Sequence, residues 1–259
     1  MATPEVALTA AEVQEILSVC GTQALLVGGQ ALALWAVIYD VTPPRILATS
    51  ISSDADFIGS AEIARKLASS LRHWKFWRPD LEDVTVQTAK LTRTVPEGIK
   101  QIDFLAAIAG LDTETIQRRA VTITLASGTG LRVLHPLDLL ESRLQNLLLI
   151  PEKRHPGGIA QAQLAIAIAQ AFLNRLLDVG SDMRSVLDAI ERIGQIAANK
   201  ALTAVTVDYS LDVLAAVPVA RIDQPLFLTK RWPTIVHAVA KQRRLYQRLR
   251  APRTSSKSD

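Results

Sequence analysis

The stretch that decides the fold is ALLVGGQAL, residues 24–32, in which a short apolar run is followed by two glycines and then by helix-forming residues. The run 24–27 predicts a buried strand, and residues 30–39 predict a helix. Gly28 and Gly29 are therefore expected in a tight turn between the two. Backbone N–H groups at such a turn can approach a phosphate closely, and the helix dipole favours its negative charge. The turn is a candidate phosphate-binding site.

Two acidic patterns follow this turn along the chain. Asp54 and Asp56 are two residues apart next to a predicted strand, in which side chains two apart project from the same face. Asp103 stands between Ile102 and Phe104 in a second predicted strand. If the two strands are neighbours, the three carboxylates converge. Hard oxygen donors of this kind suit Mg²⁺ or Mn²⁺, and three carboxylates can hold two ions.

The remaining pattern predicts an α+β fold with two parts. Residues 1–134 alternate between helical and strand-like segments and predict a mixed β-sheet core with helices. Residues 135–259 show helical periodicity without a convincing strand, which predicts a C-terminal helical domain. The expected strands lie at 56–58, 84–91, 99–106, 121–125 and 131–134, and the expected helices at 9–19, 61–71, 137–150, 159–177, 183–198 and 235–249, with a loop at 40–53.

Composition points to a soluble, cytoplasmic protein. The chain has 259 residues, of which 49% are hydrophobic, and a single cysteine, Cys20, which excludes an internal disulfide framework and a cysteine zinc cluster. No basic region followed by an apolar run marks a signal peptide at the N-terminus. The apolar stretch 159–173 is interrupted by glutamines and is shorter than the roughly 20 residues of a membrane span. We therefore expect a buried helix and no membrane association.

The motifs VGGQAL at 27–32, DADF at 54–57 and IDF at 102–104 together resemble the polymerase-β-type nucleotidyltransferase superfamily. Within it the chain is most similar to AbiEii-like nucleotidyltransferases, which include toxins of bacterial toxin–antitoxin systems. The resemblance covers roughly residues 25–149. Its motifs are specific as a set and weak singly.

The resemblance implies transfer of a nucleotidyl group from an NTP donor to a hydroxyl, with two divalent metal ions. Asp54, Asp56 and Asp103 are then the catalytic residues and metal ligands, with Asp103 also helping to deprotonate the acceptor. RNA is among the candidate acceptors, and an antitoxin protein is a candidate partner. The nucleotide-binding residues implied are Gly28, Gly29, Gln30 and Arg143.

The sequence departs from the family pattern at two places. The gap from Gly29 to Asp54 is long and contains two prolines, which predicts an inserted loop at 40–53. In addition, Arg143 stands where many AbiEii-like members place a lysine in the helix after the sheet. Arginine keeps the charge and adds a two-pronged phosphate donor.

Two functional alternatives remain open from the sequence. The chain can be a catalytically silent nucleotide-binding protein with the same fold, or it can bind RNA through its basic helical half without chemistry. The basic end at 230–257 and the pair Lys153-Arg154 also fit solvated surfaces, which are the commoner outcome for runs of charge. The basic and aromatic residues at 72–78 fit a half-buried strand better than a nucleic-acid surface.

Overall fold

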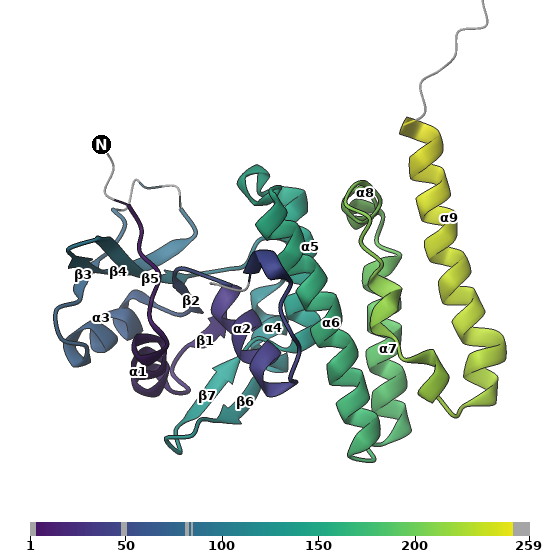
Figure 1. The fold of residues 1–259 in the computed structure, drawn as a ribbon, viewed down its shortest axis with the longest axis horizontal. Helices are drawn as coiled ribbons and strands as arrows, with labels where there is room; N and C mark the ends of the chain where they lie inside the picture. The colour runs from purple at the N-terminus through teal and green to yellow at the C-terminus, as the bar shows by residue number, and fades with distance from the viewer. Residues whose placement is uncertain (1–3, 48–50, 81–82, 84, 251–259) are drawn as a thin grey trace, which may run out of the picture. The chain divides into compact units, whose positions relative to one another are not determined.

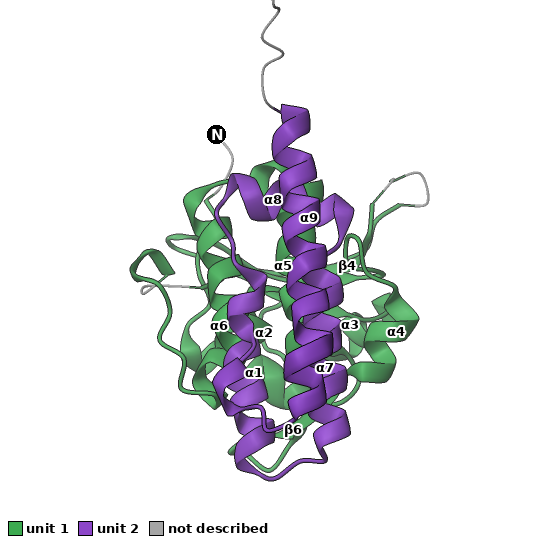
Figure 2. Ribbon diagram, turned by 90° about the vertical axis from the view of Figure 1, so that its right-hand side faces the viewer, with its two compact units in different colours: residues 1–168 green, residues 169–259 purple. Residues whose placement is uncertain are grey.

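The computed structural model describes residues 4–47, 51–80, 83 and 85–250. The chain divides into two compact units, Met1–Ile168 and Ala169–Asp259 (Figure 2). The predicted boundary at 134/135 therefore falls inside unit 1, and helix α5 (Pro136–Leu149) belongs with the sheet. The physical reason is burial: ten of its 14 residues are buried, and it packs against the helix that follows the glycine turn.

Unit 1 contains a mixed seven-stranded sheet in the order β3-β4-β5-β2-β1-β7-β6 (Figure 1). The pairs β2/β5 and β1/β7 are parallel, and the others are antiparallel. The chain therefore has an α+β fold with a helical C-terminal region. The strands are β1 (Leu25–Val27), β2 (Ala55–Ile58), β3 (Lys75–Trp77), β4 (Gln87–Val95), β5 (Gly98–Leu105), β6 (Val121–Thr124) and β7 (Gly130–Val133).

The neighbouring strands β2 and β5 each have one apolar side and one side that carries an aspartate. Phe57 and Phe104 are directly paired across β2 and β5, are fully buried, and stack with ring centroids 5.5 Å apart. Because side chains alternate along a strand, the neighbouring Asp56 and Asp103 point to the opposite side of the sheet. Burial of the two aromatic rings thus fixes the side on which the two carboxylates meet.

The helices of unit 1 follow local sequence signals. Helix α1 (Ala10–Cys20) begins at a capping box in which the Thr9 side chain and Glu12 bond to each other's backbone N–H. Helix α2 (Gly28–Ile38) begins at the first glycine itself, two residues earlier than predicted. Helix α4 (Thr113–Arg119) was not predicted, because seven residues with one buried side chain carry little periodicity. Helix α3 (Ala61–Ser70) lies close to its predicted position.

Unit 2 consists of helices and short turns. The predicted helices at 183–198 and 235–249 are confirmed as α7 (Met183–Ala197) and α9 (Trp232–Arg250). Helix α8 (Lys200–Asp208) was missed, since it follows α7 after a break of two residues and Asn199 caps its first turn. Helix α9 packs against both α7 and α8.

Helix α6 (Pro156–Asp178) is long and apolar enough to cross a membrane by length and composition. Half of its apolar window is buried inside the protein, and one such helix is weak evidence for a membrane span. The helix predicted at 159–177 is thus confirmed, and it is partly buried.

Candidate functional site

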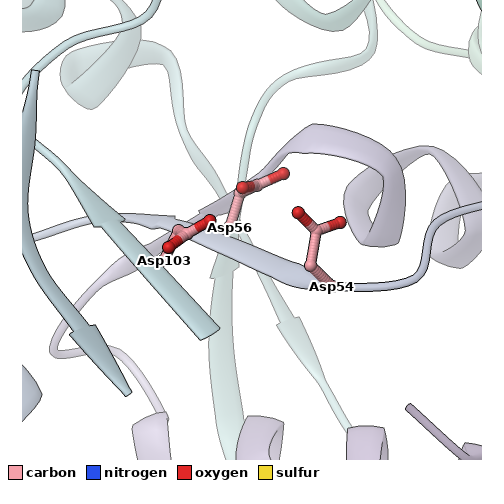
Figure 3. Close-up of side chains that lie close together, drawn as sticks. All are labelled: Asp54, Asp56 and Asp103. Atoms are coloured by element: carbon pink, nitrogen blue, oxygen red, sulfur yellow. The ribbon is translucent and has the colours of Figure 1, made fainter. Parts of the chain in front are cut away.

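Two parallel strands bring the carboxylates together. Asp56 of β2 and Asp103 of β5 are partners in the parallel register, and Asp54 lies one residue before β2 begins. One oxygen from each of the three carboxylates lies within 4.8 Å of the others (Figure 3). The sequence left open whether the strand next to Asp54 neighbours the strand of Asp103, and the sheet order places these two strands side by side. The convergence is therefore set by sheet order.

The segment before β2 fixes the outermost carboxylate. The Ser52 hydroxyl donates to Asp54 Oδ1 at 2.7 Å. The Gln30 side-chain amide donates to the Ser52 carbonyl at 3.3 Å, and the Gln161 amide donates to the Ile51 carbonyl at 2.8 Å. Helices α2 and α6 thus anchor the end of the predicted inserted loop at 40–53, of which residues 48–50 lie outside the described residues.

The glycine turn lies directly against the acidic cluster. Gly28 has φ +67°, and a Cβ placed there would lie 1.9 Å from Asp56 Oδ2. A Cβ at Gly29 would lie 2.4 Å from the Cβ of Ser52. Both positions therefore require glycine, the first for its backbone conformation as well as for space. The N-cap residue Val27 makes no side-chain cap hydrogen bond, so its own side chain does not satisfy the N–H groups of the first turn of α2.

The glycines and the three aspartates line one cavity of about 380 Å³. This volume lies within the range of small-molecule sites. Arg143 of α5 and Lys153, at the end of the short helix η2 (Pro151–Lys153), line the same cavity. The cavity therefore combines a carboxylate cluster, a helix N-terminus and two cations, all within unit 1.

Arg143 is a buried cation with spare donor capacity. Its side chain is only 7% exposed, Nη1 donates to Gln161 Oε1 at 3.1 Å, and the buried Nε has no hydrogen-bond partner. Burial lowers the pKa of the guanidinium, while the charges of Asp56 and Asp54 act against that shift. A buried donor without a partner is costly, and an anion in the cavity would offset that cost.

Asp103 is surrounded by polar side chains that the sequence did not single out. Gln87 donates to its Oδ1 at 3.0 Å, Gln101 approaches Oδ2 at 3.4 Å, and the Lys90 ammonium lies 3.7 Å from Oδ1. Lys90 is the direct cross-strand partner of Asp103 in the β4–β5 hairpin. A hairpin centred on residues 96 and 97 would have predicted this pair by counting back from the turn.

The electrostatics of the cluster oppose ionisation of its carboxylates. Burial, followed by the charges of Asp54 and Asp103, raises the pKa of Asp56 to about 7, and the nearby Arg143 and Lys153 lower it only in part. Burial is also the largest cause that raises the pKa of Asp103 to about 6, against the lowering effect of Lys90. Ionisation of all three carboxylates is thus unfavourable in the folded chain, because its own cations offset their negative charge only in part.

These shifts predict that the protein in EDTA loses stability as pH rises. Between about pH 4 and pH 7 the folded state holds protons on Asp56 and Asp103 more tightly than the unfolded state does. The contribution of Asp56 and Asp103 to the free energy of unfolding is therefore present at low pH, and it is lost as pH rises through their pKa values in the folded state. We expect Mg²⁺ to raise the midpoint of thermal unfolding little at pH 5 and progressively more up to pH 8.

The control for this pH series is the double variant Asp56→Asn/Asp103→Asn, in which the difference between EDTA and Mg²⁺ should stay small at every pH. A stabilisation by Mg²⁺ of equal size at pH 5 and pH 8 in the wild type would contradict the assignment.

The donor set fits a divalent metal centre. Three carboxylates that converge within 4.8 Å, two of them with raised pKa values, offer hard oxygen ligands and an excess of negative charge. Such ligands favour Mg²⁺ or Mn²⁺ over softer metals. Asp54, Asp56 and Asp103 are the residues that would hold it.

The structure brings most of the predicted site residues to one place. Gly28, Gly29 and Arg143 line the cavity with the three aspartates, whereas Gln30 does not line it and instead anchors the backbone at Ser52. Lys153, which the sequence assigned to a solvated loop, is exposed and lines the cavity as well.

The neighbouring Arg154 has a different, structural task. Its guanidinium donates to the carbonyls of Leu147 and Leu148 at the end of α5, at 2.9 and 2.6 Å.

Among models of known protein families none matches this chain, and no curated protein matches it either.

Proposed function

We propose that this protein is a metal-dependent nucleotidyltransferase that transfers an NMP group from an NTP to a hydroxyl acceptor. The observation that carries the proposal is that the carboxylate cluster and the Gly28-Gly29 turn line the same cavity. A carboxylate cluster alone could be a simple ion site. A glycine turn alone could be a tight connection. Their contact through Asp56 supports a site for a metal–triphosphate complex.

The triphosphate would be held mainly by backbone and by buried charge. The first turn of α2 offers backbone N–H donors and the positive end of the helix dipole. Arg143 offers its unpartnered Nε–H, and Lys153 adds a second positive charge at the cavity. These groups are opposite in charge to the aspartates, so the cavity offers partners both for phosphate oxygens and for cations.

The reaction follows from the same arrangement. The acceptor oxygen attacks the α-phosphorus, a new P–O bond forms, the bond to the bridging oxygen breaks, and pyrophosphate leaves. The Asp103 carboxylate can take the proton of the acceptor hydroxyl. Gln87 and Lys90 hold its carboxylate in place. Bound metal ions would supply polarisation of the acceptor oxygen and neutralisation of the pyrophosphate charge.

The motifs and the charge of the chain also bear on its biological role and its acceptor. The motif resemblance to AbiEii-like proteins supports a toxin-like role under the control of an antitoxin. The chain's basic C-terminal segment favours RNA as the acceptor over a protein or a small molecule. The single cysteine, Cys20, is buried, and burial raises its pKa to about 12, so it suits the reducing cytoplasm as an inert core residue.

The test is transfer of label from α-³²P-labelled ATP, CTP, GTP and UTP to total RNA, to total protein and to the protein itself, with Mg²⁺ or Mn²⁺. We expect label to appear only with divalent metal, and to be lost in EDTA and in the variant Asp54→Ala/Asp56→Ala. The labelled fraction then identifies the acceptor class.

A parallel measurement covers the case of an acceptor that is absent from the mixture. An NTP together with Mg²⁺ should raise the unfolding midpoint of the wild type, and neither should do so in the double variant. No label together with no metal-dependent stabilisation by any NTP would rule out the proposal. Stabilisation without transfer to any of the three acceptor pools would favour a catalytically silent nucleotide-binding protein.

A further inference from the structure

The charge of this chain is strongly divided along its length. Residues 224–259 hold nine of the 29 Lys and Arg residues but only one of the 25 acidic residues, Asp259. That segment is therefore net +8, and residues 1–223 are net −4. The basic character of the whole protein thus comes from its C-terminal segment, and most of the described part of that segment is helix α9.

Helix α9 has one inner side and one outer side. Ile235 and Val239 are buried, and the helix packs against α7 and α8 of unit 2 (Figure 2). Lys241, Arg244 and Arg248 are exposed and are spaced three and four residues apart, which places them in one stripe along the helix. At about 100° per residue, this stripe lies roughly opposite the side of Ile235 and Val239.

The other Lys and Arg side chains of α9 have structural partners, whereas the stripe has no ion pair among the residues that the structure describes. Arg250 and the Tyr246 hydroxyl both contact the Asp208 carboxylate, and Arg243 donates to the Thr206 carbonyl at 3.4 Å. Asp208 and Thr206 belong to α8, so these contacts hold α9 on its neighbour. In contrast, Lys241, Arg244 and Arg248 form no ion pair within the described part of the chain, and α9 contains no acidic residue.

We propose that the outer stripe of α9, made of Lys241, Arg244 and Arg248, binds the phosphate backbone of a nucleic acid. The stripe spans about 10 Å along the helix axis. A duplex presents one negative charge per roughly 1.7 Å of its axis, so several phosphates lie within reach of the three side chains. Fixed cations without internal partners gain most from such a polyanion, because binding releases its condensed counterions.

An anionic membrane is the rival partner for a basic helix. A helix that lies on a membrane turns an apolar face toward the lipid, whereas the buried apolar side of α9 faces its own unit. Leu245 and Leu249 are exposed, at 50% and 79%, but they lie on the flank of the stripe. The arrangement therefore favours phosphates over lipid. The proposal concerns unit 2 alone and does not depend on the nucleotidyltransferase site.

The experiment is a fluorescence anisotropy titration of the full chain in EDTA and without NTP, so that the metal site plays no part. The probes are fluorescein-labelled 20-nucleotide single-stranded RNA, the matching RNA duplex and the matching DNA duplex, each at 50 to 200 mM salt. The triple variant Lys241→Ala/Arg244→Ala/Arg248→Ala should bind at least about tenfold more weakly at the lowest salt, with a log–log salt slope smaller by about 2 to 3.

The matched control removes the same charge from unit 1, in Arg72→Ala/Lys75→Ala/Arg78→Ala, three exposed cations that lie in β3 or within three residues of it. This variant should keep at least half of the wild-type affinity. Circular dichroism and the unfolding midpoint establish that both variants are folded. The arms with RNA and DNA decide which nucleic acid is preferred.

Three results would overturn the proposal. The wild type could fail to bind any probe at 50 mM salt. Both triple variants could lose affinity equally, in which case net charge and not α9 governs binding. Finally, the chain could sediment with vesicles of 30% phosphatidylserine while it binds no nucleic acid, in which case the face is a membrane surface.

Discussion

Replacing Asp56 with Asn is expected to abolish nucleotidyl transfer and, at the same time, to stabilise the protein in EDTA. Transfer should fall by about 10³-fold or more, because the amide cannot serve as an anionic ligand between the other two carboxylates. The unfolding midpoint at pH 8 should rise by a few degrees, roughly 2–4 °C per kcal/mol gained. The cause is removal of a charge that burial and two neighbouring carboxylates disfavour, as the pKa of about 7 indicates.

The opposite signs of these two effects separate a functional residue from a structural one. Asp80→Asn is the matched control, since Asp80 is an exposed aspartate of the same unit. It should change neither transfer nor the midpoint appreciably. If Asp56→Asn instead lowers the midpoint in EDTA, the carboxylate stabilises the fold and the charge argument fails. In Mg²⁺ the stability gap between wild type and variant should narrow, because only the wild type gains from the ion.

In the variant Gly28→Ala, nucleotidyl transfer should fall by at least about tenfold, and NTP should no longer stabilise the protein. The free energy of unfolding should fall by roughly 1–3 kcal/mol. The added Cβ would lie 1.9 Å from Asp56 Oδ2, and the residue has φ +67°. The carboxylate, the turn or both must therefore move, and either movement separates the phosphate turn from the metal ligands. Transfer assays and urea titration measure the two effects.

The structure offers a control in which the backbone strain is present without the collision. Gly128, in the same unit, has φ +83°, and a Cβ there would meet nothing within 4 Å. Gly128→Ala should therefore cost only the strain of a left-handed alanine, about 1–2 kcal/mol, and should leave transfer intact. Equal loss of transfer in both variants would mean that stability alone, and not the geometry of the turn, controls activity.

The glycine turn and the acidic motifs illustrate what local sequence can predict. Strand β1 leads directly into helix α2, whose first two residues are the glycine pair, because apolar runs and glycines act within a few residues. The spacing of Asp54 and Asp56 already places both carboxylates on one side. Asp54 lies just before β2, which begins at Ala55, yet its carboxylate still reaches the same site.

The polar surroundings of the site were beyond local reasoning. Lys153 was assigned to a solvated loop, and it lines the cavity because η2 ends beside it. Gln30 was assigned to nucleotide binding, and its amide instead anchors Ser52. Both outcomes depend on where a side chain meets a segment far away in sequence. Periodicity and motif spacing carry no information on such long-range contacts.

By itself, the sequence determined the kinds of residue and their order: a glycine pair after an apolar run, a paired acid, a third acid in an apolar strand, and a basic C-terminal helix. Only the tertiary structure decided that Asp56 and Asp103 are register partners and that Gly28 touches Asp56. The unit boundary at Ile168 and Ala169 was decided in the same way. The physical reason is that strand order and helix burial are fixed by the packing of the whole core, whereas turns, caps and side-chain alternation are fixed by neighbours along the chain.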